Sequence, residues 1–493
     1  MSDQGGGGAG ILATLDNRDI GSFYIFLAIL ATIGGFLFGF DSSNIGSALV
    51  FLPFHLGDFG TGIVVAGASL GSFVGALAAG PLTDRFGRKA LLLVDSGLFA
   101  LGSLVSAIAP EAVTLIIGRL IIGLSIGADS AIATAYISEF APKARRGSLA
   151  IIQQWMITIG ILSAYLIAVI ILLIAPHATS SVDWRVLLGV GFIPAIVSLL
   201  LRARMPESPR WLLEKGREDK VLEAMATLGI SVTPEQVHAE AVAVQTERDR
   251  VQARHNWTPA VRRALIVVCV FFVFQQITGI NVAFYYGPHL LSPYFLVGQR
   301  TLVQSEVAGV YAAGILAVVN VAATYFAFRF IDRVGRRRLA MGAYLVMIVF
   351  LLVGAYGASF LHGVAQLLVI MIGFAIFISA FAIGIGGTGW LIQGEVFPTA
   401  VRGRAAAIGA SVDWLANYAL VLAFPFMQTG LGLGWTMVIF AFLCLCGFAF
   451  VNLFLPETKG KSAEEITTLF DGPVNRADPG QPSVPTRPAA PAS

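Results

Sequence analysis

Two short charged motifs occur twice in this chain, each copy between long apolar runs. The motif Asp-Arg-Phe-Gly-Arg-Lys at 84–89 returns as Asp-Arg-Val-Gly-Arg-Arg at 332–337, an offset of 248 residues (332 − 84). The motif Glu-Phe-Ala-Pro at 139–142 returns as Glu-Val-Phe-Pro at 395–398, an offset of 256 (395 − 139), and both copies precede an Arg-Gly pair. This repeat predicts two similar membrane bundles, the plan of a carrier that rocks about a central site.

The chain carries too little charge for a water-facing surface. Charged residues make up 12 % and hydrophobic residues 56 %, whereas a soluble domain carries roughly 25 % charge. We therefore expect lipid to be the solvent of this protein. The net charge of +3 gives no reason to expect a nucleic-acid partner.

We predict an all-α membrane protein, because the apolar runs reach the roughly 20 residues that a bilayer requires. Residues 22–202 and 264–455 are expected to form two pseudo-symmetric six-helix bundles, twelve transmembrane helices in all. The expected tails are 1–21 and 456–493, and the polar insert 203–263 is expected to hold surface helices over 214–228 and 234–254.

Basic residues predict the orientation. Of 32 lysines and arginines, 29 fall on the side of both tails and the insert, which we expect to be cytoplasmic. Arg185 and Arg300 fall on the opposite side, and Arg119 is the only arginine expected inside a span.

The repeated basic motifs are candidates for a cytoplasmic gate. We expect their arginines to pair with carboxylates across the bundle, which can lock the carrier in one state. The alternative is that they only mark the positive, cytoplasmic face; the duplication argues against it. The candidate gate residues are Asp84, Arg85, Arg88, Glu139, Arg146, Glu207 and Arg210 in the first half, and Asp332, Arg333, Arg336, Glu395 and Arg402 in the second.

Further motifs resemble the sugar porter family of the major facilitator superfamily, which includes bacterial proton-coupled sugar symporters and facilitative glucose transporters. They are Gly-Gly-Phe-Leu-Phe-Gly-Phe-Asp at 34–41, Gly-Arg at 118–119, Pro-Glu-Ser-Pro-Arg at 206–210, Gln-Gln-Ile-Thr-Gly-Ile-Asn at 275–281 and Pro-Glu-Thr-Lys-Gly at 456–460. The resemblance covers about residues 23 to 465. It implies twelve helices around a central sugar site that opens alternately to either side.

The amides of the seventh span suit a sugar, because an amide both donates and accepts hydrogen bonds, as a hydroxyl does. On a regular helix Gln276 and Asn281 would point roughly 140° apart, so we expect a bend or break at Gly279. The alternative role for Gln275, Gln276 and Asn281 is to hold helices together. By resemblance, Gln154, Asn320, Trp390, Asn417, Phe38 and Tyr285 are further substrate-binding candidates, with Trp390 able to stack on a sugar ring and Trp414 nearby.

Asp41 is an acid inside an apolar span, where a charge needs a partner or a role. We expect it to pair with Arg119 when ionised and to release it when protonated, which would couple proton and sugar movement. In the family that the chain resembles, Asp at this position goes with proton symport. The alternative is a permanent structural ion pair.

Some residues depart from the family pattern. Asp413 stands where bacterial sugar symporters usually carry an amide, Asp129 stands in the fourth span where small apolar residues are usual, and Asp95 is a further acid in the third span. In a cavity, Asp413 would favour a solute rich in donors, such as a polyol or amino sugar, or would act as a second proton site. These departures leave the exact solute open.

We expect import of a monosaccharide or related polyol by alternating access with proton symport. The alternatives are an uncoupled sugar uniporter and a carrier of the same fold for a non-sugar organic solute; Asp41 would neutralise Arg119, which argues against an anionic one. A sugar sensor would need longer cytoplasmic extensions. No enzyme motif, cofactor or metal site is expected. We expect a monomer in the plasma membrane, in contact with lipid, protons and solute.

Overall fold

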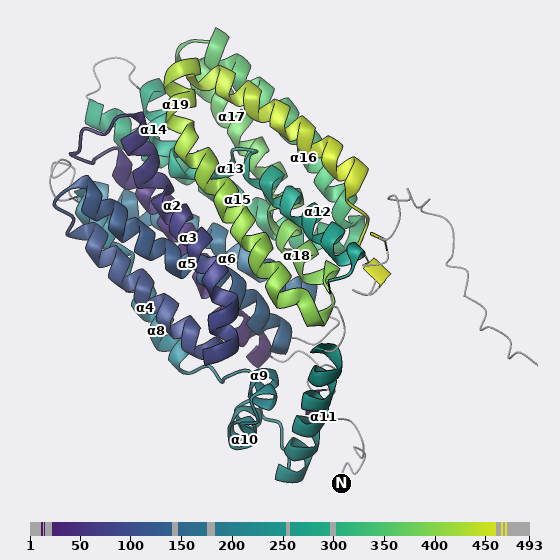
Figure 1. Cartoon of the computed structure of the whole chain (residues 1–493). Helices are drawn as coiled ribbons and strands as arrows, with labels where there is room; N and C mark the ends of the chain where they lie inside the picture. The colour runs from purple at the N-terminus through teal and green to yellow at the C-terminus, as the bar shows by residue number, and fades with distance from the viewer. Residues whose placement is uncertain are drawn as a thin grey trace, which may run out of the picture.

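The computed structural model describes residues 22–140, 146–174, 183–252, 257–295 and 302–459, with 11, 12, 14, 465, 466, 469 and 470. Within these ranges the chain is helical and has no strands, so the predicted all-α fold is confirmed. The two halves of the chain lie side by side as two bundles, and three short helices protrude from one end (Figure 1).

The N-terminal bundle contains six crossings, the last of which is divided at Gly191. Its helices are α2 (Ser22–Leu49), α3 (Asp58–Phe86), α4 (Arg88–Ala107), α5 (Ala112–Phe140), α6 (Arg146–Ile174), and α7 (Asp183–Val190) continued by α8 (Phe192–Ala203).

The C-terminal bundle contains more interrupted helices. Its first crossing comprises α12 (Pro259–Gln276), α13 (Ile280–Tyr285) and α14 (Gly287–Leu291), followed by the short turn Ser292–Phe295, then α15 (Leu302–Val334) and α16 (Arg336–Phe360). The next crossing is α17 (Gly363–Phe381), a π-helical turn Ala382–Gly386 and α18 (Gly387–Val396). The last two crossings lie within α19 (Thr399–Phe454), which turns at Gly432, where φ is 78°.

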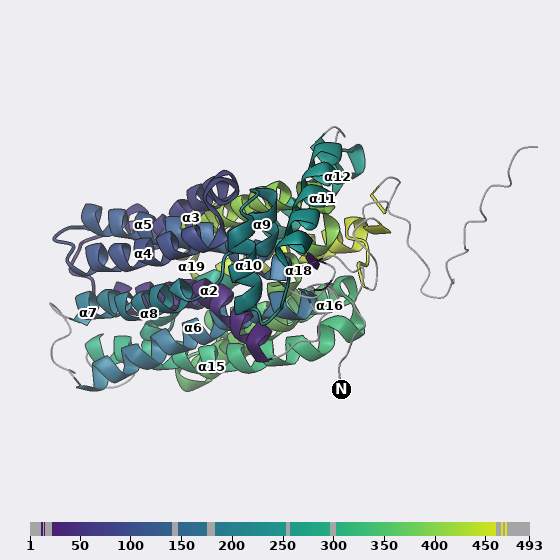
Figure 2. The same ribbon diagram turned by 90° about the horizontal axis from the view of Figure 1, so that it is seen from below.

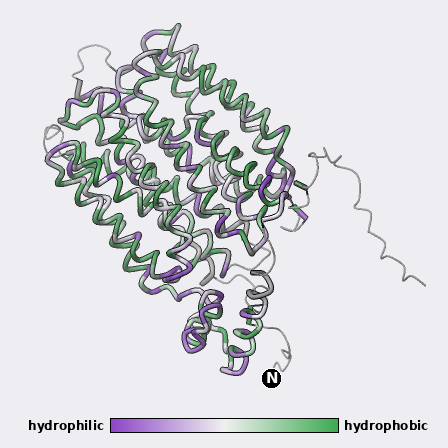
Figure 3. Tube along the Cα trace, in the orientation of Figure 1, coloured by the Kyte–Doolittle hydropathy of each residue, from purple (hydrophilic) through white to green (hydrophobic). Residues whose placement is uncertain are grey.

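These helices account for the predicted twelve crossings. By length and composition, ten helices among the described residues can cross a membrane. One of them, α19, contains two crossings, and the 28-residue α2 adds the twelfth. Apolar residues follow the bundle helices, whereas polar residues gather in the protruding helices and at helix ends (Figure 3).

The polar insert forms three helices rather than the two predicted stretches: α9 (Pro209–Glu214), α10 (Glu218–Thr227) and α11 (Pro234–Gln252). The additional helix is α9, and Ser208 is its N-cap residue. The Ser208 hydroxyl accepts a hydrogen bond from the Trp211 backbone nitrogen at 3.3 Å. The Trp211 indole donates to the Asp84 carbonyl at 3.2 Å, which holds the insert against the N-terminal bundle. Figure 2, a view from this end, shows α9, α10 and α11 together.

The two bundles meet chiefly along two helix pairs, α3 with α19 and α6 with α15. The Tyr165 hydroxyl of α6 donates to the Phe284 carbonyl of α13 at 2.8 Å. The Thr429 hydroxyl of α19 donates to the Asp58 carboxylate of α3 at 3.0 Å. The bundles are therefore in contact on the side away from the insert.

Candidate functional site

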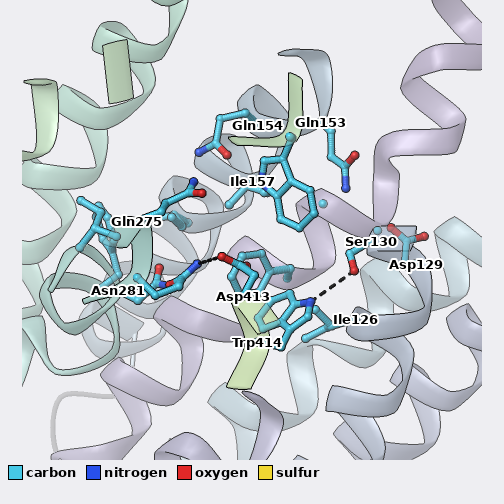
Figure 4. A pocket seen from close by; sticks show the side chains of 18 of the residues that line it. Ile126, Asp129, Ser130, Gln153, Gln154, Ile157, Gln275, Asn281, Asp413 and Trp414 are labelled. Atoms are coloured by element: carbon cyan, nitrogen blue, oxygen red, sulfur yellow. Dashed lines mark hydrogen bonds between the residues drawn. The ribbon is translucent and has the colours of Figure 1, made fainter. Parts of the chain in front are cut away.

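A cavity lies between the bundles, midway along the helices, and helices of both halves line it (Figure 4). Among the predicted substrate-binding residues, those that line it are Phe38, Gln154, Gln275, Gln276, Asn281, Asn320, Trp390 and Asp413. Asn417 and Tyr285 do not line it. Asn417 is fully buried and donates to the Ser69 hydroxyl at 3.2 Å, which links α19 to α3.

The predicted break at Gly279 is confirmed. Helix α12 ends at Gln276 and α13 begins at Ile280, and Gly279 between them has φ 86°, in the left-handed region that favours glycine. A Cβ at this position would lie 2.6 Å from the Phe440 ring. The break turns Asn281 back towards Gln276, so that the Asn281 amide nitrogen donates to the Gln276 amide oxygen at 2.7 Å.

The amides form a chain of hydrogen bonds that ends on a carboxylate. Gln276 accepts from Asn281 and donates to the Asp413 carboxylate at 2.7 Å. Gln275 donates to the Gly386 carbonyl at 3.1 Å, in the π-helical turn before α18, and its own amide oxygen has no partner among the described residues. The C-terminal half thus presents donors and acceptors side by side, as recognition of several hydroxyls requires.

Aromatic rings lie beside these amides. The Trp390 ring is half-buried and lies 5.2 Å from the Phe272 ring, and the Trp414 ring meets Phe38 edge-on at 4.8 Å. The Trp414 indole donates to the Ser130 hydroxyl of α5 at 3.3 Å, which joins the two bundles across the cavity (Figure 4).

Two polar residues that line the cavity, Gln153 and Ser130, were not among the predicted site residues. Each stands beside a residue that had been singled out, Gln154 and Asp129, within an apolar run. A polar side chain in such a run was the available signal, but only the packing of α5 and α6 against α2 turns both towards the cavity.

The predicted pairing of Asp41 with Arg119 is confirmed. Arg119 is fully buried in α5; its Nη1 donates to Asp41 and its other nitrogens donate to the carbonyls of Val64 at 3.3 Å and Val65 at 3.4 Å. The second carboxylate oxygen of Asp41 has no partner among the described residues.

The expectation that Arg119 is the only arginine inside a span is wrong. Arg202, near the end of α8, is 1 % exposed, pairs with Asp95 of α4 at 2.6 Å and also pairs with Asp129 of α5. These carboxylates neutralise the guanidinium, so it remains inside the bundle rather than at the membrane surface. Because Arg119 and Arg202 are both bound to acids, the argument against an anionic solute still holds.

A family model described as "Sugar (and other) transporter" matches residues 27–470. The chain belongs to this transporter family. Its members are transporters rather than enzymes, and the chain is a multi-pass membrane protein.

Known relatives support this assignment. The chain is 34 % identical to the glucose transporter GlcP of Staphylococcus epidermidis, over 89 % of this chain and 95 % of that protein. It is 33 % identical to the arabinose-proton symporter of Bacillus subtilis, over 91 % of this chain and 95 % of that protein. Its structure is similar to the partially occluded inward open conformation of the xylose transporter XylE of E. coli, with a TM-score of 0.75 and 26 % identity, covering 90 % of this chain and 100 % of that chain.

At the insert end of the transporter, residues of the first basic motif form a compact cluster with two glutamates. We call this cluster of Gly87, Arg88, Glu139 and Glu207 the first box. Arg88 pairs with Glu139 at 2.8 Å, and its backbone nitrogen donates to Glu207 at 3.0 Å. Gly87 has φ 98°, and a Cβ there would lie 2.3 Å from the Glu207 carboxylate. Burial raises the pKa of Glu139 above its usual value, and the Arg88 guanidinium only partly opposes this effect.

The second motif repeats the box with the same geometry. Arg336 pairs with Glu395 at 2.8 Å, and its backbone nitrogen donates to Glu457 at 2.9 Å. Gly335 also has φ 98°. Glu457 was absent from the predicted gate set, although it follows the twelfth span as Glu207 follows the sixth.

The remaining gate candidates lie around these boxes. The Arg85 guanidinium lies over the Phe86 ring at 5.2 Å, and Asp84 is 3.9 Å from Arg88. Arg210 and Arg402 donate to the carbonyls of Glu139 at 3.2 Å and Phe397 at 3.0 Å, and the Arg333 carbonyl accepts from Lys459 at 2.7 Å. The side chains of Arg146 and Asp332 lie outside the described residues.

Proposed function

We propose that this transporter imports a monosaccharide or related polyol by alternating access, together with a proton. The observation that carries the sugar assignment is the chain of amides from Asn281 through Gln276 to Asp413, in the same cavity as Trp390. Amides and a carboxylate bind hydroxyls, and an indole face packs on the apolar face of a sugar ring. Relatives named for glucose, arabinose and xylose transport support the same class of solute.

Proton coupling is proposed to act through Asp41. When ionised, Asp41 holds Arg119 of α5; when protonated, it loses most of that attraction, and α2 and α5 are free to shift. The second Asp41 oxygen has no partner among the described residues, so a proton has an acceptor there. A relative named arabinose-proton symporter supports this reading.

The two basic boxes are proposed to form the cytoplasmic gate, with both termini and the insert on that side. The support is the asymmetry of basic residues, which favours the cytoplasmic face of membrane proteins. We propose that the carrier works as a monomer in the plasma membrane, because the cavity is complete within one chain.

The proposal is tested with purified carrier in liposomes that contain a pH dye. Pentoses, hexoses, inositols and amino sugars are added outside one at a time, with Gln276→Ala as the matched control. Internal acidification with one class of solute, much weaker in Gln276→Ala at the same solute concentration, is the expected result.

Two other outcomes decide against parts of the proposal. Uptake of labelled sugar without acidification would make the protein a uniporter and the Asp41–Arg119 pair structural. No response to the whole panel would overturn the sugar assignment in favour of another organic solute.

A further inference from the structure

A second buried charge cluster lies in the N-terminal bundle, apart from the Asp41–Arg119 pair. Arg202 of α8 binds Asp95 of α4 through Nη1 and Asp129 of α5 through Nη2. The three side chains are 1 %, 2 % and 4 % exposed. Because two terminal nitrogens of one guanidinium hold the two carboxyl groups, the acids lie next to each other.

The cluster has one cation for two carboxyl groups. The other groups that face Arg202 are neutral: the Ser96 hydroxyl at 3.2 Å and the backbone carbonyls of Leu30, Ala31 and Leu92. No further lysine, arginine or histidine of the described residues pairs with either acid. With both acids ionised, the cluster would carry an uncompensated negative charge inside the membrane, which is costly.

One oxygen of the cluster lacks a donor. Asp95 Oδ1 accepts from Arg202 and Ser96, whereas Asp95 Oδ2 is buried without a hydrogen-bond partner among the described residues. Asp129 is the neighbouring group within hydrogen-bonding reach of Asp95. Two adjacent carboxyl groups share a proton rather than both ionise, as in the paired aspartates of aspartic proteases. A proton between Asp95 and Asp129 would satisfy the unpaired oxygen and cancel the excess charge.

The cluster also has a route to water. Asp129 is one of the residues that line the central cavity, and Figure 4 shows it beside Ser130. Its carboxyl group lies directly against Gly34 of α2, where a Cβ would come within 2.0 Å of it. Glycine at this position therefore leaves the room that the carboxyl group occupies.

We propose that Asp95 and Asp129 together bind one exchangeable proton, which enters and leaves through the central cavity. This is a second protonation site, held by Arg202 and separate from Asp41. Since Asp129 lines the cavity that is proposed to hold the solute, its access to water changes whenever the cavity opens or closes. The inference does not depend on which solute is carried.

Infrared spectroscopy of the purified carrier, without added solute, tests the site. The probe is the C=O stretch of a protonated carboxyl group, recorded across pH and after transfer to D2O. We expect a band that shifts in D2O, falls as pH rises, is lost in Asp95→Asn and in Asp129→Asn, and remains in the matched controls Asp41→Asn and Asp413→Asn.

A second measurement does not rely on altering the cluster. The double variant Asp41→Asn/Asp413→Asn removes the other two aspartates that are buried among the described residues, and the exchangeable band must persist in it. Its disappearance there, or its presence unchanged in both cluster variants, would overturn the proposal. A cluster band that neither shifts in D2O nor responds to pH would also overturn it, since the proton would then be permanently bound. Failure of sugar transport would leave these spectra unaffected.

Discussion

The two bundles of this transporter have matching charged clusters at the insert end but differ in the residues of their interiors. At the insert end, each bundle has an arginine that pairs with a glutamate at 2.8 Å and a glycine with φ 98°. In each, a second glutamate accepts a hydrogen bond from the backbone nitrogen of that arginine. Inside, the N-terminal bundle holds two buried arginines with their acids, Arg119 and Arg202. The C-terminal bundle instead presents neutral amides and one carboxylate, Asp413.

This difference fits the proposed function, in which one half of a duplicated scaffold binds the proton and the other binds the solute. The boxes tie helix ends together, a need that both halves have equally. The interiors are free to differ, so that one half carries groups able to bind protons and the other carries groups able to bind hydroxyls. The comparison predicts that substitutions in the two interiors have different effects, whereas substitutions in the two boxes have the same effect.

Asp41→Asn should have the largest effect. The neutral amide cannot exchange a proton, so solute accumulation driven by a pH gradient should fall to equal concentrations on both sides, while exchange of solute across the membrane persists. Labelled-solute uptake in liposomes, with and without an imposed pH gradient, measures both. Uphill accumulation retained by this variant would show that Asp41 is not the coupling acid.

Gln276→Ala should weaken solute binding without abolishing proton binding. The variant removes the amide that joins Asn281 to Asp413. Loss of one or two hydrogen bonds at about 1–1.5 kcal/mol each predicts a fall in affinity of about 5- to 150-fold. Titration calorimetry with the solute that the liposome panel identifies measures this affinity. Unchanged affinity would show that the amides serve helix packing instead.

Glu207→Gln and Glu457→Gln compare the two boxes directly. Each removes the charge that accepts hydrogen bonds from the first backbone nitrogens of α4 or α16. We expect each variant to lose about 1–2 kcal/mol of stability, with similar shifts in thermal unfolding in detergent. A clear loss in one and none in the other would show that the matching geometry does not reflect matching energetics.

Glu139→Gln should have the smallest effect, on the pH dependence of stability. The folded-state pKa of Glu139 is raised, chiefly by burial, so the folded protein holds this proton more tightly than the unfolded chain. Stability should therefore fall as pH rises from the usual pKa of glutamate through the raised value. The variant should flatten this slope in thermal unfolding measured across pH, and Glu395→Gln serves as the matched variant of the other box. An unchanged slope in Glu139→Gln would contradict the burial argument.

Several features could be predicted from the sequence because they depend on local composition and spacing. Apolar runs gave the twelve crossings, the repeated motifs gave the two halves, and the Gln-Gln…Asn spacing required a break at Gly279. The pairing of Asp41 with Arg119 was also predicted, because an acid in lipid needs a partner and Arg119 was the only arginine expected inside a span.

The remaining features depended on which helices lie side by side. From the sequence, Arg202 is a basic residue at the end of a span. It becomes the buried partner of Asp95 and Asp129 only because α4 and α5 pack against α8. Glu457 joins the second box only because the chain after α19 returns to the start of α16. Hydropathy determines whether a segment enters the membrane; the partner of a buried charge is determined by contacts between segments far apart in the chain, and these exist only in the tertiary structure.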